Sequence, residues 1–264
     1  MNLSRFSITI LVASMLSAMT IVSCAKSDST SEVDKSRIEK IVHDYLLDNP
    51  QILVEVSKKL QQKQQQEMKE IEKRAHQAIP KHAKAIFNSQ LSPSEGDHQA
   101  NITVVEFFDY QCSHCKNMTE VLSNIKNNNA DVRIVYKEFP IFGNDSMDAS
   151  RAALAAAKQQ KYKAMHEALM STPGPLTEKK IMKAAANAGL NVEQLKSDMD
   201  SPEVRKELEQ NLELSQKLGL LGTPAFVIGS THKGDQENSV VFFIPGSLNE
   251  EMIQTYIEKV RQDQ

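Results

Sequence analysis

Two cysteines separated by two residues are the side chains in this sequence best suited to chemistry. Cys112 and Cys115 form a Cys-Ser-His-Cys motif that follows an apolar run and precedes a helical pattern, a context typical of a redox pair. Free amides and the positive end of the dipole at a helix N-terminus stabilise a thiolate. We therefore expect Cys112 to be the attacking thiolate and Cys115, one turn further in, to be the resolving thiol. His114 lies between them, where an imidazole can donate to the thiolate or add positive charge beside it.

Three other uses of a CxxC motif fit this sequence less well. A structural zinc site needs four ligands, and the sequence offers one further cysteine, Cys24, and scattered histidines without metal spacing. Haem attachment requires a histidine after the second cysteine, and that position holds Lys116. A disulfide closing so short a loop would add little stability. The sequence thus favours thiol–disulfide exchange and predicts neither a metal ion nor a dissociable cofactor.

Apolar patterns on both sides of the cysteine pair indicate the elements that must position it. Residues 102–108 and 132–139 are predicted strands, with the helix that begins at the CxxC motif between them. A strand, helix and strand cross over right-handed, so the two strands should be parallel neighbours. A helical block, two strands and an amphipathic helix follow, at residues 146–218, 225–228, 240–244 and 248–260.

Three motifs, in this order, resemble those of DsbA-like thiol:disulfide oxidoreductases. They are residues 105–115 (VEFFDYQCSHC), 137–141 (KEFPI) and 222–226 (GTPAF). The resemblance covers about residues 100–264. It implies an α/β thioredoxin fold with an inserted helical domain at about residues 144–219.

The resemblance also assigns roles around the cysteine pair. It implies that Pro224 is a cis proline facing the pair and that Thr223 presents its backbone to substrate, where it pairs with an extended chain. It makes Glu106 the buried acid that carries the proton of Cys115. A strand glutamate paired with Lys137 is a second interpretation of Glu106, and the two are compatible.

Residues 35–88 are predicted to form a helical arm ahead of this domain. Pro50 suits the first turn of a second helix, which we expect to end at Ile79, before Pro80. Its thin apolar stripe must meet another surface, either the protein's own globular domain or a partner chain. Thr223 before the proline is typical of the disulfide isomerases of the wider family, and resemblance to them implies a dimer whose arms come from the N-terminal region. Some larger DsbA-like proteins are trimers. We favour a partner chain, and thus a homodimer, with a trimer as the alternative.

The N-terminus predicts export. Residues 1–23 combine one early positive charge with an apolar stretch diluted by Ser and Thr, as in a signal peptide. The sequence ending at Cys24 resembles a bacterial lipobox. By the sorting pattern of bacterial lipoproteins, Ala25 after it implies a periplasmic protein that is lipid-anchored at the outer membrane. Ordinary cleavage that discards Cys24 is the alternative and would leave a soluble periplasmic protein. Residues 24–34 are predicted to be a polar tether.

The composition limits the classes of function. The chain has 264 residues and a net charge of −3, which offers no general basis for nucleic-acid binding. The sequence predicts a periplasmic enzyme that introduces or isomerises disulfides in exported proteins, with a membrane oxidase or reductase resetting its cysteine pair. A dedicated reductase of periplasmic partners and a non-catalytic, chaperone-like binding module are the alternatives.

Overall fold

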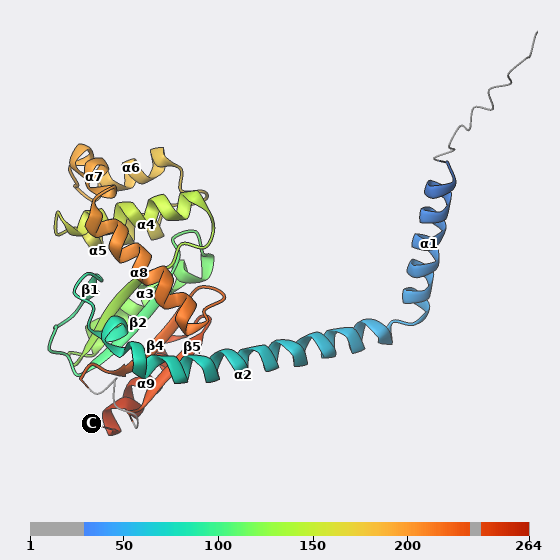
Figure 1. Ribbon diagram of the computed structural model, residues 1–264, viewed down its shortest axis with the longest axis horizontal. Coiled ribbons are helices and arrows are strands. Elements are labelled where there is room, and N and C mark those ends of the chain that lie inside the picture. The colour runs from blue at the N-terminus through green and yellow to red at the C-terminus, as the bar shows by residue number, and fades with distance from the viewer. Residues whose placement is uncertain (1–28, 233–238, 264) are drawn as a thin grey trace, which may run out of the picture. The chain divides into compact units, whose positions relative to one another are not determined.

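A computed structural model describes residues 29–232 and 239–263, and it divides the chain into two compact units, Met1–Gln61 and Gln62–Gln264 (Figure 1). The predicted signal peptide and Cys24 lie outside the described residues. Helix α1 spans Ser29–Asp48, so the predicted tether is wrong from residue 29 onward. Residues 29–34 contain neither glycine nor proline, so no strong helix breaker interrupts this polar segment.

The second unit is built on a five-stranded sheet in the order β1-β3-β2-β4-β5. Strands β2 and β3 are parallel, and the other neighbouring pairs are antiparallel. The parallel pair confirms the crossover predicted from the sequence. The strands are β1 (Ser94–Glu95), β2 (Ile102–Phe108), β3 (Val132–Glu138), β4 (Ala225–Ser230) and β5 (Val241–Pro245).

Helices cover both faces of this sheet, and a helical insertion separates β3 from β4 (Figure 1). This confirms the DsbA-like thioredoxin fold with an N-terminal helical segment. Gly219, with φ of 70°, ends the last helix of the insertion in the left-handed conformation that glycine tolerates. The helices after α1 are α2 (Gln51–Phe87), α3 (Ser113–Asn128), α4 (Asn144–Ala157), α5 (Tyr162–Met170), α6 (Glu178–Asn187), α7 (Val192–Met199), α8 (Pro202–Leu218) and α9 (Glu250–Gln262).

The sheet separates two apolar clusters. Alternate residues of β2, such as Val104 and Phe108, pack on one face with α3, α9 and the insertion. The residues between them, Val105 and Phe107, pack on the other face with α2 and the end of α8. Every residue of β2 and β3 is buried, which explains why neither strand alternates cleanly between apolar and polar residues.

Helix α2 continues past the proline that was expected to end it. Pro80 lies inside the helix, so the prediction of an end at Ile79 is wrong. Proline removes one backbone hydrogen bond and costs about 3 kcal/mol in a helix interior. Ile79 before the proline and Ile86 and Phe87 after it are buried, and the burial of each side chain stabilises the fold by about 1.5–3 kcal/mol. Packing on the sheet therefore outweighs the local cost.

Polar contacts fasten the last turn of α2 to β3. Arg133 of β3 donates to the Phe87 carbonyl and to Asn88 Oδ1, the latter over 3.1 Å. A cation at the C-terminus of a helix also meets the negative end of its dipole. The part of α2 from Ile71 onward is thus an integral part of the second unit.

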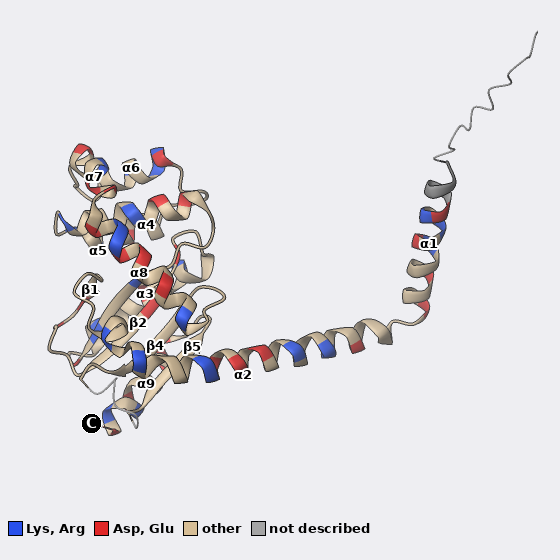
Figure 2. Cartoon of the chain, viewed as in Figure 1, with Lys and Arg blue, Asp and Glu red and all other residues tan. Residues whose placement is uncertain are grey.

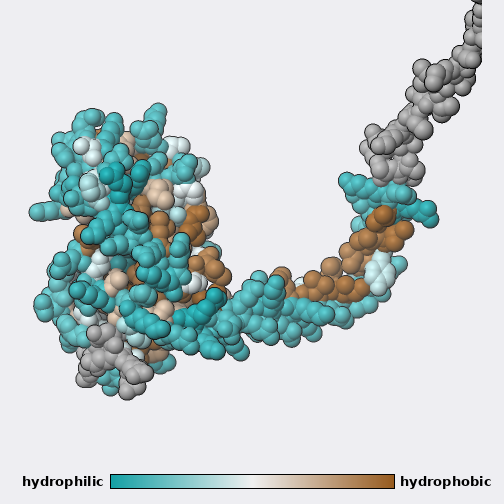
Figure 3. All heavy atoms as spheres, in the orientation of Figure 1, coloured by the Kyte–Doolittle hydropathy of each residue, from teal (hydrophilic) through white to brown (hydrophobic). Residues whose placement is uncertain are grey.

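The first unit exposes apolar side chains on both of its helices. Figure 3 shows apolar atoms gathered on α1 and on the start of α2. The exposed residues are Ile38, Ile41, Val42, Tyr45, Leu47, Leu53, Val54, Val56 and Leu60, each between 50% and 67% exposed. No helix in the described part of the chain is long and apolar enough to cross a membrane.

Candidate active site

Cys112 lies at the N-terminus of α3, directly after the loop that leaves β2. It is the N-cap residue of α3, and its amide donates to the Asp109 carbonyl over 3.1 Å. Its Sγ lies 3.3 Å from the Thr223 carbonyl oxygen, to which the thiol donates. Cys112 therefore occupies the helix N-terminus that the sequence predicted for the attacking cysteine.

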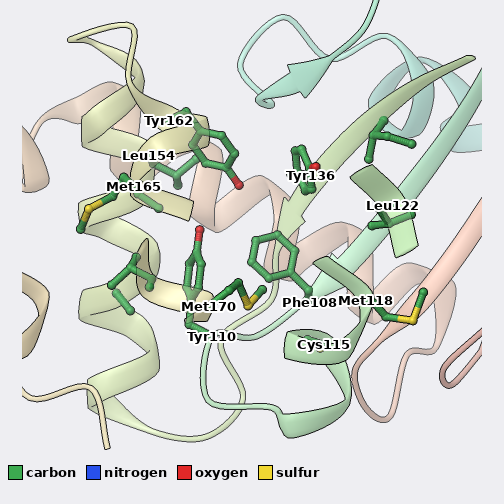
Figure 4. Packing of buried hydrophobic residues seen from close by; sticks show 14 of the residues in the cluster. Phe108, Tyr110, Cys115, Met118, Leu122, Tyr136, Leu154, Tyr162, Met165 and Met170 are labelled. Atoms are coloured by element: carbon green, nitrogen blue, oxygen red, sulfur yellow. The ribbon is translucent and has the colours of Figure 1, made fainter. Parts of the chain in front are cut away.

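Cys115 lies one turn into α3 and is one of the buried residues of the apolar cluster (Figure 4). It is 1% exposed, against 5% for Cys112, and both cysteines are free thiols. Burial raises the pKa of the Cys115 thiol, and the Glu106 carboxyl raises it further. Contacts with the Asp109 backbone and the Thr223 hydroxyl lower this pKa, but burial prevails. Both thiols are therefore buried, and Cys115 is the more deeply buried of the two, as expected of the resolving thiol.

Glu106 is a buried acid on the same face of the sheet as Cys115. It is 1% exposed, and its Oε1 has no hydrogen-bond partner in the described part of the chain. Burial raises its pKa well above 4.5, and the charges of Cys112 and Glu138 raise it further. A raised pKa favours the protonated carboxyl, which can give its proton to a neighbouring thiolate.

Glu106 does not pair with Lys137, contrary to the second interpretation. The strand register places Glu106 opposite Tyr136 and Phe107 opposite Lys137. Because side chains alternate between faces, Lys137 points to the other side of the sheet. There its Nζ lies 4.0 Å from Glu207 Oε1.

The predicted substrate-binding residues lie beside the cysteine pair. The Thr223–Pro224 peptide bond is cis, as the resemblance implied, and the Thr223 carbonyl accepts from Cys112. The Pro224 carbonyl accepts from the Gly246 amide over 2.8 Å, which ties this turn to the end of β5. His114, in the first turn of α3, is exposed.

Asp109 holds the active-site loop, and the sequence prediction did not include it. Its Oδ1 accepts from the Gln111 amide and the Ser146 hydroxyl, each over 2.7 Å. Its Oδ2 accepts from the amides of Ile141 and Phe142 over 2.7 and 3.1 Å. One buried carboxylate therefore joins the CxxC loop to the loop between β3 and α4. An aspartate just before the motif, bonding the amide two residues on, is the available sequence signal.

A second buried acid, Glu138, contacts a cluster of aromatic side chains, of which Figure 4 shows Tyr110 and Tyr162. Its Oε1 accepts from the hydroxyls of Tyr110 and Tyr162 over 3.1 and 2.9 Å. Burial raises its pKa to about 8. His166 lies 3.1 Å from the Tyr110 hydroxyl, and burial lowers its pKa to about 3. Residues distant in the sequence form this cluster, so no local pattern predicts it.

Comparison with known proteins agrees with this geometry. The DSBA-like thioredoxin domain matches residues 103–258. The chain belongs to this family. Its members are thiol–disulfide oxidoreductases, and the described residues place the cysteine pair at the expected position of the fold. The N-terminal domain of the copper resistance protein ScsC matches residues 34–67, so a second family feature covers α1 and the start of α2.

Solved structures of similar proteins cover different shares of this chain. A thioredoxin-like oxidoreductase from Silicibacter pomeroyi is 37% identical, with a TM-score of 0.61, covering 68% of this chain and 97% of that one. BcfH from Salmonella enterica Typhimurium is 32% identical, with a TM-score of 0.64, covering 88% and 98%.

Curated relatives of this family member include much longer proteins. The Na(+)/H(+) antiporter NhaA of Herminiimonas arsenicoxydans is 28% identical over 140 residues, which is 53% of this chain. The match spans 22% of the length of that protein. The likeness is therefore to one segment of the antiporter.

Within the described ranges, no group of three His, Cys, Asp or Glu residues is arranged to hold a metal ion.

Proposed function

We propose that the protein is a periplasmic enzyme that introduces or isomerises disulfide bonds in exported proteins through Cys112 and Cys115. The observation that carries this proposal is the asymmetry of the pair at the N-terminus of α3. Cys112 Sγ meets the carbonyl of Thr223 over 3.3 Å, while Cys115 is buried beside Glu106. Such an arrangement supports attack at one sulfur and departure of the other.

In the oxidising direction, the Cys112–Cys115 disulfide accepts two electrons from a substrate dithiol. A substrate thiolate attacks Cys112 Sγ, the disulfide breaks, and Cys115 leaves with the electron pair and takes a proton. A second substrate thiolate then attacks the substrate sulfur of the mixed disulfide. Cys112 leaves as a thiolate, and the substrate keeps the new disulfide. Isomerisation starts instead from the Cys112 thiolate and returns it unchanged.

Glu106 is the proposed source of the proton that Cys115 takes. Burial raises the pKa of this carboxyl and so favours its protonated form. Both side chains are buried on the same face of the sheet, and the Glu106 carboxyl raises the pKa of the Cys115 thiol. Thr223 and Pro224 are proposed to hold the extended substrate chain next to Cys112, and His114 to favour its thiolate.

The N-terminal part of the chain is proposed to export, anchor and assemble the enzyme. Residues 1–23 act as the signal peptide, and Cys24 carries lipid at the outer membrane, followed by a short tether. Residues 35–88 then join copies of the chain into a homodimer, with a trimer as the alternative. The apolar residues exposed on α1 and the start of α2 support this assembly, because such a face is stable when it meets a partner.

Reactivation of scrambled ribonuclease tests both the active site and the arm. The intact protein is compared with a version that begins at Gln62 and with Cys112→Ala. The shorter version begins at Gln62 because the second unit starts there, and a start after Phe87 would remove six buried residues of α2.

Each result has a distinct meaning. Activity that needs residues 29–61 indicates an isomerase that works as an oligomer. Oxidation of reduced ribonuclease by both versions, without unscrambling, indicates a disulfide donor reset by a membrane oxidase. Full activity of Cys112→Ala in both assays would overturn the proposal in favour of a binding module.

A further inference from the structure

A lysine-lined cavity lies on the face of the sheet opposite the cysteine pair. Its volume is about 660 Å³, and its walls come from the end of α2, the segment after it, and α8. Lys81, Lys84, Lys206 and Lys217 line it, and all four are exposed. Figure 2 shows lysine or arginine on both α2 and α8 in this unit. The cavity falls within the range of about 300–1,000 Å³ typical of small-molecule sites.

Buried polar side chains add to this cavity. Lys137 and Asn211 line it and are 2% and 1% exposed. Asn211 Nδ2 is a buried donor without a hydrogen-bond partner among the described residues. Lys137 Nζ donates to Ser92 Oγ, and the same Nζ lies 4.0 Å from Glu207 Oε1. A buried donor without an acceptor is destabilising, and a ligand acceptor in the cavity would satisfy it.

The charge around the cavity is positive although the chain is acidic. Lys137 and the four exposed lysines face Glu213 at the rim and Glu207 behind Lys137. Lys217 pairs with Glu213 over 2.7 Å. The chain as a whole carries a net charge of −3, so its overall charge opposes the binding of an anion. Affinity for an anion would therefore come from this cavity.

We propose that this cavity binds a ligand that carries several phosphate groups. Lysine is a point charge that contacts phosphate oxygens without the bidentate geometry that arginine offers to one carboxylate. Five lysines spread around a cavity of about 660 Å³ suit several separated anionic groups better than a single one. The proposal does not depend on the redox function, because Lys137 and Glu106 lie on opposite faces of the sheet.

Two binding experiments with the purified protein test the proposal. The first is calorimetric titration with inorganic tripolyphosphate, and the second is sedimentation with phosphatidylglycerol or phosphatidylcholine vesicles. The variant Lys81→Ala/Lys206→Ala removes two lysines of the cavity. The control Lys179→Ala/Lys183→Ala removes two exposed lysines of α6 and changes the net charge equally. We expect the first variant to bind at least tenfold more weakly than wild type, and the control to match wild type.

The two arms separate the sources of the phosphate groups. Binding of tripolyphosphate that is lost in Lys81→Ala/Lys206→Ala supports a soluble ligand. Binding confined to phosphatidylglycerol vesicles, and lost in the same variant, would overturn the proposal in favour of an anionic membrane surface, because each of these headgroups carries a single phosphate. Absence of binding by wild type in both arms, or an equal loss in the control, would overturn the proposal. The redox assays above are independent of either result.

Discussion

Replacing Asp109 by asparagine should loosen the loop that carries the cysteine pair. The carboxylate accepts four hydrogen bonds, two on each oxygen. Asparagine keeps one oxygen and turns the other into a donor. The least costly orientation points the new NH₂ group at Ser146, whose hydroxyl can turn to accept, and at the Gln111 amide, which then has no acceptor.

The expected loss of stability follows from this count. One hydrogen bond to a charged group is lost, worth about 1.5–3 kcal/mol, and the others lose the charge that strengthened them. We expect Asp109→Asn to lower the free energy of unfolding by about 2–4 kcal/mol. Thiol–disulfide exchange should also slow, because the CxxC loop and residues 141–142 lose their shared anchor.

Urea unfolding followed by far-ultraviolet circular dichroism measures the first effect, and oxidation of a dithiol peptide measures the second. Asp145→Asn is the matched control, since Asp145 lies next to Ser146 in the first turn of α4. Its removal should cost less than about 1 kcal/mol through the helix dipole. Equal stability of the two variants would refute the role assigned to Asp109.

Three further predictions concern the arm and the buried acids. Phe87→Ala should destabilise the second unit by about 3–5 kcal/mol because the ring is buried. Leu60→Ser should instead leave the urea midpoint of the second unit unchanged and lower the mass of the proposed homo-oligomer in light scattering. The native Glu138 carboxyl, with a pKa of about 8, keeps a proton that the unfolded chain has lost, so the stability of the wild type falls as the pH rises from 6.5 to 8. Glu138→Gln should reduce this fall. Urea midpoints that show the same pH slope in the variant as in the wild type would contradict this. Glu106→Gln should slow reduction of the disulfide about 10²-fold at pH 7, with a weaker pH dependence, because Cys115 loses its proton source; stopped-flow kinetics that match wild type would exclude that role.

The sequence predicted the parts of the site that are carried by local patterns. The CxxC motif after an apolar run placed Cys112 at the start of a helix, and the parallel pairing of β2 and β3 followed from the crossover rule. The position of Thr223 and Pro224 came from the resemblance alone. No spacing in the sequence connects residues 112 and 223, because the whole insertion lies between them.

The errors arose where tertiary packing decides the outcome. Lys137 faces away from Glu106, but in strands buried on both faces the alternation of side chains cannot be read from hydrophobicity. Helix α2 passes through Pro80 because burial on the sheet outweighs the loss of one hydrogen bond. Glu138 acquires its partners, and Asp109 three of its four, only when loops and helices distant in the sequence come together.

Side chains alternate between the two faces of the sheet along β3, so consecutive residues of this strand lie in two different environments. Tyr136 faces the acid and aromatic groups behind the cysteines, and Lys137 faces the lysine-lined cavity. Substitutions on the two faces that lie more than about 7–10 Å apart and share no partner should have additive energetic effects. Insertion of one residue in β3 would exchange the two faces at once. The strand therefore accepts changes of side chain but not of length.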